Sequence, residues 1–400
     1  MTPRGVTPRA GRLRVVVLGY VVRGPLGGLA WHHLQYALGL ARLGHDVWFV
    51  EDSDDYPGCY DPATHAVTAD PSAGLAFAAR AFARIGLGDR WAYHDALGTG
   101  WRGPAAAHAP ATVARADVLL NLSGVNPLRD WGARVPRRVL VDTDPVFTQI
   151  RHLSDPAARA RAAEHTHFAT FGENFGRPGC SIPDDEFPWR PTRQPVVLDA
   201  WPVTPPRAGA PFTTVMQWTS YAAREHAGHR YGMKDASFGA FETLPSRTAA
   251  RLELALGSAG APRECLRALG WRVRDPGGPS RDPWTYQRYL ACSAGEFGVA
   301  KHGYVAAHTG WFSERTAGYL ASGRPTVVQD TGFTRWLRAD AGVLAFRTLD
   351  EAADALARVR ADHARHCRAA RAVASEYFDA RRVLPELLEL AATNGALAGR

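Results

Sequence analysis

One stretch near the N-terminus constrains the fold of this 400-residue chain more than any other. Residues 13–19 are a continuous apolar run rich in β-branched side chains, which is typical of a strand buried inside a parallel sheet. A glycine-rich turn over residues 24–28 follows, and residues 29–43 then keep apolar side chains at helical spacing until Gly44 ends the pattern. Residues 46–50 form a second apolar run. A strand, a helix and a strand in this order predict an α/β fold with a doubly wound sheet.

The same alternation continues along the chain and restarts after an irregular segment. Residues 175–211 are rich in proline, arginine and glycine and have little periodicity, which marks a linker. Before this linker, we expect strands over residues 117–122, 138–141 and 167–171 and helices over 71–85 and 155–164. After it, we expect strands over residues 212–218, 251–256, 271–273, 296–299, 326–329 and 343–346 and helices over 262–269, 283–292, 314–322, 349–375 and 381–392. This order predicts two doubly wound domains that face each other across a cleft at the C-terminal ends of their strands.

The domain boundaries follow from these patterns. We expect a disordered tail over residues 1–12, a first domain over 13–205, a second over 206–376 and a closing helical segment over 377–400. The tail is basic but lacks the apolar core of a secretory signal. The longest apolar run near the N-terminus, residues 15–22, is far shorter than the ~20 residues of a membrane span. We therefore expect no stable insertion into a membrane.

Charge and cysteine content narrow the class of protein further. The net charge is +8, but all except two of the 47 basic residues are arginine, a bias typical of a GC-rich and, we expect, bacterial genome. The arginines are scattered and form no long basic run, so we expect no nucleic-acid binding. The cysteines are odd in number, lack metal-ligand spacing and are scattered at Cys59, Cys180, Cys265, Cys292 and Cys367. They predict reduced thiols in a cytoplasmic protein.

The two lysines form the first candidate for binding chemistry. Lys234 follows the strand expected at residues 212–218, and Lys301 follows the strand expected at 296–299. Both positions lie near the C-terminal ends of strands, where a cleft is expected. A compact ammonium group suits a phosphate oxygen, although the survival of two lysines by chance is an alternative. Glu296 lies on the same strand and would either contact a ligand or pair with Lys301.

A helix start in the second half of the chain is the strongest candidate for binding an anion. Ser313 and Thr316 place hydroxyl groups at the start of the helix expected over residues 314–322, and Arg315 adds a charged fork. Free backbone N–H groups and the positive end of a helix suit a diphosphate. Glu314 would instead accept hydrogen bonds from the two hydroxyls of a ribose. The alternative is that Ser313 is a plain N-cap.

Polar residues at the first helix and its turn form a second group of candidates. Gly27 and Gly28 would allow a ligand to approach the backbone closely, or would form only a tight turn. The dinucleotide-binding spacing G-x-G-x-x-G is absent. His32 and His33 are adjacent and so cannot share one face of the helix. At least one of them is expected to be structural, and the other is a candidate general base.

Two more polar pairs follow expected strands in the first half. Asp142 and Asp144 come after the strand at residues 138–141 and point to opposite sides if extended geometry persists. One of them would cap a turn, and the other would act as a base or accept a hydrogen bond from a sugar hydroxyl. Glu173 and Asn174 follow the next strand and are candidates for binding an acceptor, or form an ordinary turn.

Several of these segments resemble one protein superfamily. Residues 310–332 (GWFSERTAGYLASGRPTVVQDTG), the Gly-Gly turn at 27–28 and residues 43–47 (LGHDV) resemble the GT-B fold glycosyltransferases. The resemblance extends over essentially the whole chain and implies two facing Rossmann-like domains with a C-terminal helix that crosses back to the first. Many retaining members have two glutamates eight residues apart, where this chain has Gly310 and Gly318. The resemblance therefore carries over neither the retaining mechanism nor the individual donor contacts.

The resemblance implies transfer of a hexose from a nucleoside-diphosphate sugar, bound by the second domain, to a hydroxyl or another nucleophile of a small molecule bound by the first. The acceptor would be a natural product or a cell-surface glycan precursor. We expect His32, His33 or Asp144 to act on the acceptor hydroxyl, and Glu173 and Asn174 to contact the acceptor. Donor contacts are expected from Gly27, Gly28, Lys234, Glu296, Lys301, Ser313, Glu314, Arg315 and Thr316.

We expect neither a metal nor a cofactor beyond the nucleotide sugar, because protein cations and a helix end can stabilise the leaving diphosphate. The protein would act as a monomer or a homodimer. The alternatives are a sugar-nucleotide epimerase or hydrolase of the same fold, and a noncatalytic protein that binds sugar nucleotides as a partner of another enzyme.

Overall fold

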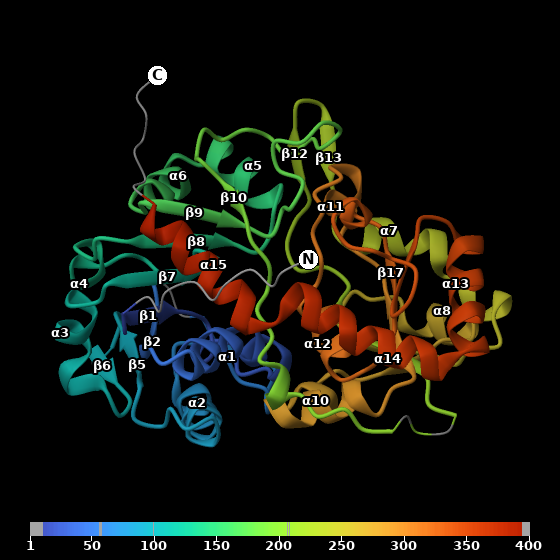
Figure 1. The fold of residues 1–400 in the computed structure, drawn as a ribbon, viewed down its shortest axis with the longest axis horizontal. Coiled ribbons are helices and arrows are strands. Elements are labelled where there is room, and N and C mark those ends of the chain that lie inside the picture. The colour runs from blue at the N-terminus through green and yellow to red at the C-terminus, as the bar shows by residue number, and fades with distance from the viewer. Residues whose placement is uncertain (1–10, 56–57, 99, 206, 208, 394–400) are drawn as a thin grey trace, which may run out of the picture.

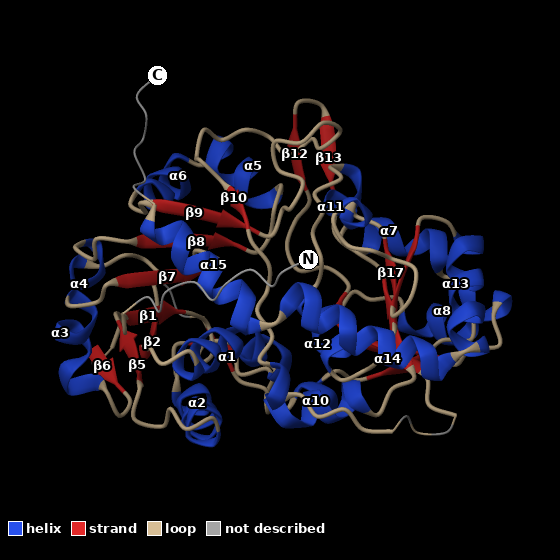
Figure 2. Cartoon of the chain, viewed as in Figure 1, coloured by secondary structure: helices blue, strands red, loops and turns tan. Residues whose placement is uncertain are grey.

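The computed structural model describes residues 11–55, 58–98, 100–205, 207 and 209–393. The tail expected over residues 1–12 lies outside the described residues except for its last two, which are exposed and belong to no helix or strand. The described chain forms two parallel-stranded sheets flanked by helices, as Figure 2 shows. This arrangement confirms the expected α/β class and the two Rossmann-like halves.

The first sheet has eight strands in the order β10-β9-β8-β7-β1-β2-β5-β6, and all its pairs are parallel except β5 with β6. Its strands are β1 (Arg14–Leu18), β2 (Asp46–Asp52), β5 (Trp91–Asp95), β6 (Gly100–Arg102), β7 (Val118–Leu122), β8 (Arg138–Asp142), β9 (His167–Thr170) and β10 (Arg190–Pro191). Its helices are α1 (Gly27–Arg42), α2 (Ser72–Arg84), α3 (Ala109–Ala114), α4 (Asp130–Ala133), α5 (Phe147–Ser154) and α6 (Pro156–Ala163), and a small hairpin pairs β3 (Cys59–Tyr60) with β4 (Val67–Thr68).

The second sheet has six parallel strands in the order β15-β14-β11-β16-β17-β18. Its strands are β11 (Phe212–Gln217), β14 (Leu252–Gly257), β15 (Arg272–Arg274), β16 (Gly295–Gly298), β17 (Thr326–Gln329) and β18 (Val343–Phe346). A hairpin of β12 (Arg224–His226) and β13 (His229–Tyr231) extends from it. Its helices are α7 (Asp235–Phe238), α8 (Arg263–Ala268), α9 (Gly277–Ser280), α10 (Pro283–Ala291), α11 (His302–Ala306), α12 (Glu314–Ala321), α13 (Leu349–Ala361) and α14 (His363–Val373).

The single helix expected over residues 349–375 is two helices, α13 and α14. Asp362 has φ −140° and ψ 63°, which interrupts the helical backbone, and its side chain accepts a hydrogen bond from the backbone N–H of Arg365. Aspartate favours this N-cap position because its short side chain satisfies a free backbone donor. Helical periodicity continues through such a break, so the pattern alone predicts one long helix.

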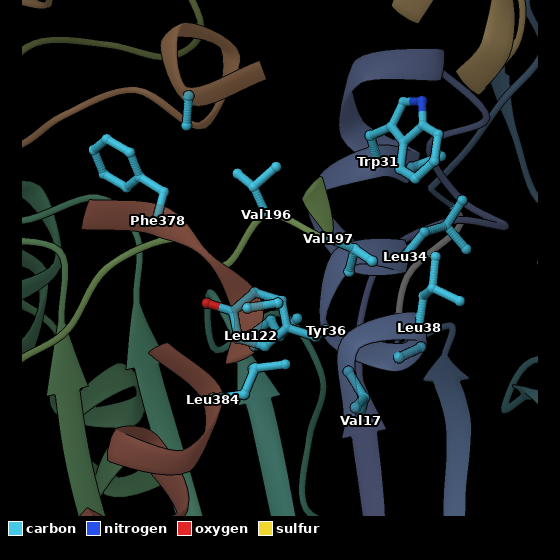
Figure 3. Packing of buried hydrophobic residues seen from close by; sticks show 14 of the residues in the cluster. Val17, Trp31, Leu34, Tyr36, Leu38, Leu122, Val196, Val197, Phe378 and Leu384 are labelled. Atoms are coloured by element: carbon cyan, nitrogen blue, oxygen red, sulfur yellow. The ribbon is translucent and has the colours of Figure 1, made fainter. Parts of the chain in front are cut away.

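The chain crosses from the second sheet back to the first through its last helix, as expected. Figure 1 shows α14 beside the second sheet and α15 (Ala380–Ala392) beside the first. Leu384 of α15 packs so closely on Gly39 of α1 that a Cβ atom on that glycine would lie 2.5 Å from it. Figure 3 shows Leu384 and Phe378 in a buried cluster that also contains residues of α1, such as Leu34 and Leu38. The boundaries at residues 205 and 376 stay predictions.

The two halves share one hydrophobic core beside the first helix. Trp31 of α1 lies 5.2 Å from Trp201 and 6.0 Å from Trp284, measured between ring centroids. Its indole N–H donates a hydrogen bond to the Pro283 carbonyl at 2.6 Å. This contact fixes α1 against the second half and so sets the spacing of the two sheets. Among the described residues, no helix combines the length and the hydrophobicity needed to cross a bilayer.

Candidate functional site

A cleft of about 720 Å³ lies between the two halves and is lined by residues of both. On the first side it is bounded by α1, α5 and the loops that follow β7 and β8; on the second side, by the end of β11, the loop after it and the start of α12. The cleft thus lies at the C-terminal ends of the strands, where α/β sheets bind ligands. It brings together seven of the predicted site residues: His32, Asp144, Lys234, Lys301, Ser313, Glu314 and Arg315.

Lys234 is a cation without a counter-ion in this cleft. It is half-buried, and among the described residues no carboxylate forms an ion pair or hydrogen bond with its ammonium group. Burial lowers its pKa well below the usual value, and the positive charges of Arg315 and Lys301 lower it further. An ammonium held in this way gains stabilisation from an anion that enters the cleft.

Arg315 is held beside Lys234 by a buried carboxylate. Its Nε donates a hydrogen bond to Glu296 Oε1 at 2.6 Å, and another guanidinium N–H donates to the Val215 carbonyl at 3.1 Å. Burial disfavours the charged form, but the charge and hydrogen bond of Glu296, together with weaker electrostatic contributions from Tyr286 and Glu314, outweigh burial, so the pKa of Arg315 is raised. Glu296 is fully buried on β16 and pairs with Arg315 rather than with Lys301. It therefore positions the guanidinium instead of lining the cleft itself.

The N-terminus of α12 opens on the same cleft. Ser313 is its N-cap, and its Oγ accepts a hydrogen bond from the backbone N–H of Arg315 at 3.2 Å. The capping role that was the alternative for Ser313 is therefore present, and its side chain also lines the cleft. Glu314 is exposed in the first turn and lines the cleft, whereas Thr316 is only 2% exposed and lies outside it.

Asp144 and Lys301 join the two halves across the cleft. Lys301 Nζ lies 2.8 Å from Asp144 Oδ1 and 2.9 Å from the Tyr221 hydroxyl. The hydroxyls of Tyr221 and Tyr304 both donate to the same carboxylate. Burial raises the pKa of Tyr221, and the charge of Asp144 raises it further, so the phenol remains a donor. Asp144 thus faces the cleft as a carboxylate with three donors.

The sequence predicted that one of Asp142 and Asp144 has a structural role, without saying which. In the structure that residue is Asp142. It is 2% exposed and accepts hydrogen bonds from Thr148, Gln149 and Thr170 at 2.7–3.1 Å. It also accepts from the backbone N–H of Asp144 at 2.9 Å, which orients the loop that presents Asp144.

The two adjacent histidines lie on different faces of α1, as expected for neighbouring residues of a helix. His33 is 1% exposed, shares a hydrogen bond of 2.8 Å with the Leu29 carbonyl, and faces the core outside the cleft. Burial, together with the neighbouring His32, lowers its pKa to about 3. His32 lines the cleft, and no residue that the structure describes forms a hydrogen bond with its buried Nε2. Burial lowers the pKa of His32 to about 4, so its imidazole is neutral at pH 7.

The remaining predicted residues lie outside the main cleft. A Cβ atom on Gly27 would lie 2.3 Å from the Asp282 carbonyl oxygen, and one on Gly28 would lie 3.0 Å from the Tyr286 ring, so these glycines allow α1 to approach α10. Gly28 also lines a small adjoining cavity of about 20 Å³ together with Glu314 and Arg315.

Glu173 and Asn174 lie at the contact between the two halves instead of in the cleft. Glu173 pairs with Arg193. The side-chain amide of Asn174 donates to the carbonyls of His308 and Gly332, each at 3.0 Å.

The structure adds residues to the site that the sequence patterns did not single out. Tyr221 and Tyr304 bind Asp144, and Arg151 and Arg224 line the cleft on the side of α5 and β12. Tyr221 and Arg224 follow the end of β11, and that position alone was a usable signal. Among the described residues, no group of three or more His, Cys, Asp or Glu side chains is placed to hold a metal ion.

No protein-family model and no curated protein matches the sequence. Solved structures match nearly all of the chain. The Anabaena protein HepE, in complex with UDP and glucose, matches with a TM-score of 0.54 at 10% identity, covering 96% of this chain and 100% of that one. An alpha-glucosyltransferase in complex with UDP and DNA matches with a TM-score of 0.59 at 11% identity, with the same coverage of both chains. The same-named enzyme in complex with UDP matches with a TM-score of 0.58 at 10% identity, covering 95% and 100%. These likenesses show that the chain has the GT-B glycosyltransferase fold.

Proposed function

We propose that this protein transfers a sugar from a nucleoside-diphosphate sugar to a hydroxyl group of a small-molecule acceptor. The fold supports the class of reaction, because chains with this fold bind UDP and UDP-glucose in the solved structures. We extend the proposal to a hexose as the transferred group and to a natural product or glycan precursor of a bacterium as the acceptor. The nucleotide sugar is then the co-substrate, and no further cofactor takes part.

One observation carries the proposal: the unpaired ammonium of Lys234 beside Arg315 at the start of α12. When the bond between the anomeric carbon and the diphosphate oxygen breaks, negative charge develops on the leaving diphosphate. Fixed cations and a helix N-terminus stabilise that charge without reorganising, because they are already in place. Ser313 and Glu314 line the cleft beside these cations, and we assign the Ser313 hydroxyl and the Glu314 carboxylate to the nucleotide, with Glu314 accepting from ribose hydroxyls.

The opposite wall of the cleft supplies the groups that act on the acceptor. The acceptor oxygen forms the new bond to the anomeric carbon and must lose its proton. His32 presents a neutral imidazole whose Nε2 has no other partner, so it can accept that proton. Asp144 already accepts hydrogen bonds from Tyr221, Lys301 and Tyr304, so its carboxylate oxygens are engaged in holding these three groups. We therefore assign the base to His32 and the orientation of the acceptor to Asp144.

Binding of the donor is the direct test of the proposed function. In a thermal-shift screen of UDP, dTDP, GDP and ADP sugars, at least one is expected to raise the melting temperature in a saturable way. A ligand at about 100 times its Kd stabilises a protein by about 2.7 kcal/mol through mass action. Formation of a glycosylated product with the best donor, absent without acceptor, then identifies a transferase. If none of these nucleotides binds, the proposal fails.

We propose on the same geometry that the reaction needs no metal ion. Because Lys234, Arg315 and the start of α12 face the site of the diphosphate, we expect transfer to proceed at an unchanged rate in excess EDTA. The measurement is the initial rate with EDTA, with Mg²⁺ and with Mn²⁺. A strict requirement for Mn²⁺, with complete loss of activity in EDTA, would contradict this expectation.

A further inference from the structure

Two arginines in the cleft have no role in binding the donor or the acceptor hydroxyl as described above. Arg151 on α5 and Arg224 on β12 both line the cleft, and both are partly buried. Each has a buried guanidinium Nε without a hydrogen-bond partner. Buried guanidinium groups are almost always paired, because an unmet charged donor is costly. Neither Nε has a partner within the described part of the chain, which favours a ligand that supplies an acceptor.

The surrounding carboxylates do not neutralise these arginines. A side cavity of about 300 Å³ adjoins the cleft, and Arg151 lines both. In that cavity Asp142 is bound by hydroxyl and amide donors, and Asp155 caps the start of α6. Glu164 is exposed, and no ion pair joins it to Arg151 among the described residues.

The other arginines and lysines that line the two cavities contrast with this pair. Lys301 pairs with Asp144, Arg315 with Glu296, and Arg161 with Asp54. Lys234 forms no ion pair among the described residues, but the positive charges that act on it most strongly are those of Arg315 in the first turn of α12 and Lys301 at the start of α11. The positive charge of Arg224 lies close enough to Tyr221 to oppose the rise in the pKa of that phenol. The Tyr221 ring in turn lies 5.5 Å from the ring of Phe147 on α5. Arg151 and Arg224 therefore belong to the side of the cleft formed by α5 and the hairpin.

We propose that Arg151 and Arg224 form a second anion-binding subsite, which holds a carboxylate or phosphate group of a substrate while the donor diphosphate occupies the start of α12. This inference rests on the proposed function and specifies the substrate class. A planar guanidinium binds carboxylate and phosphate oxygens in a bidentate manner, and two of them favour a doubly charged or forked group. Such a group lies on the acceptor, or on the donor sugar as in a uronic acid.

Inorganic phosphate tests the subsite without knowledge of the natural substrate. We expect phosphate to bind the UDP-saturated protein by calorimetry, and Arg151→Gln and Arg224→Gln each to weaken that binding about tenfold. Arg161→Gln is the matched control, because it removes an arginine of the same side cavity that is already paired with Asp54. UDP affinity in each variant shows that the fold and the donor site are intact. Failure of phosphate to bind beside UDP, or equal affinity in wild type and both variants, overturns the proposal.

Matched substrates then locate the anionic group. If it belongs to the acceptor, the wild-type preference for a hydroxy acid over its methyl ester, as a ratio of kcat/KM, falls about tenfold in both variants. If it belongs to the donor, the preference for UDP-glucuronate over UDP-glucose falls instead. Unchanged preferences in both comparisons overturn the proposal. If another nucleotide of the thermal-shift screen binds in place of UDP, that nucleotide replaces UDP in these experiments. If none of them binds, the proposed function fails separately. Phosphate titration of the free protein then still tests the subsite, because Arg151→Gln and Arg224→Gln should weaken phosphate binding whereas Lys234→Ala should not.

Discussion

Replacing Lys234 with methionine is expected to lower kcat/KM for the best nucleotide-sugar donor by about 10²–10³-fold without destabilising the free protein. The loss arises because the ammonium lies next to the developing charge of the diphosphate in a partly desolvated cleft. The free protein is expected to keep its stability, because burial and the charges of Arg315 and Lys301 disfavour the ammonium more than Glu314 and Glu296 favour it. A residue that is unfavourable in the free protein and favourable in the complex is typical of a binding site.

Calorimetry separates this role from a structural one. Because burial and like charges lower the pKa of Lys234, an incoming diphosphate raises that pKa, and donor binding by the wild type is expected to take up protons. Lys234→Met removes this uptake together with the affinity. Lys301→Met is the contrasting variant, because it deprives Asp144 of an ion-pair partner and is expected to lower the melting temperature. Unchanged donor affinity and unchanged proton uptake in Lys234→Met would remove this lysine from the site.

The alternation of strands and helices was predictable because parallel strands are buried on both faces. The sequences of such strands consist mostly of consecutive apolar residues, and β1, β7 and β8 each contain at least three in a row. The strand β5 ends in the polar residues His94 and Asp95 and was not predicted. The helix α5 is short and follows Val146, whose φ of 71° breaks the preceding pattern, so it too was not predicted.

The chemistry of the site was predictable in type but not in pairing. The sequence predicted different roles for Asp142 and Asp144. Which of the two faces the cleft depends on the loop that Asp142 orients by accepting a hydrogen bond from the Asp144 backbone N–H. The contact between Glu296 and Arg315 joins a strand to a helix 19 residues later, and its geometry depends on the packing of α12. Gly27 and Gly28 do mark a close approach, but the approaching group is α10. A glycine in a sequence indicates that another group approaches the backbone closely, but it does not indicate which group that is.

Lowering the pH from 7 to 5 is expected to remove most of the contribution that three buried neutral histidines make to the free energy of unfolding. Burial lowers the pKa of His32 and of His165 to about 4, and burial together with His32 lowers that of His33 to about 3. Unfolded histidine titrates near 6.5, so between that pH and the folded pKa values the unfolded chain binds more protons. The stabilisation is therefore complete above about pH 7 and is lost as the pH falls. At pH 5 the loss is about 2 kcal/mol for each histidine.

Other buried groups act in the opposite direction, so the test compares variants. Burial raises the pKa of Glu51 and of Asp142, and their contribution to stability falls as the pH rises. A single pH profile of the wild type therefore mixes the two effects. The change produced by removing one histidine isolates its own contribution, whatever the substitution costs at neutral pH.

His33→Phe and His165→Gln are the two variants that test the origin of the pH dependence. Each variant lacks one buried imidazole. Between pH 7 and pH 5 its free energy of unfolding, measured with urea, is therefore expected to fall by about 2 kcal/mol less than that of the wild type. His229→Gln, at an exposed position on β13, is the control and should follow the wild-type profile. His33 faces the core and His165 lies near the side cavity, so a common effect on the slope would come from burial and not from the cleft. A drop between pH 7 and pH 5 as large as that of the wild type in both variants would show that these histidines are already protonated in the folded state.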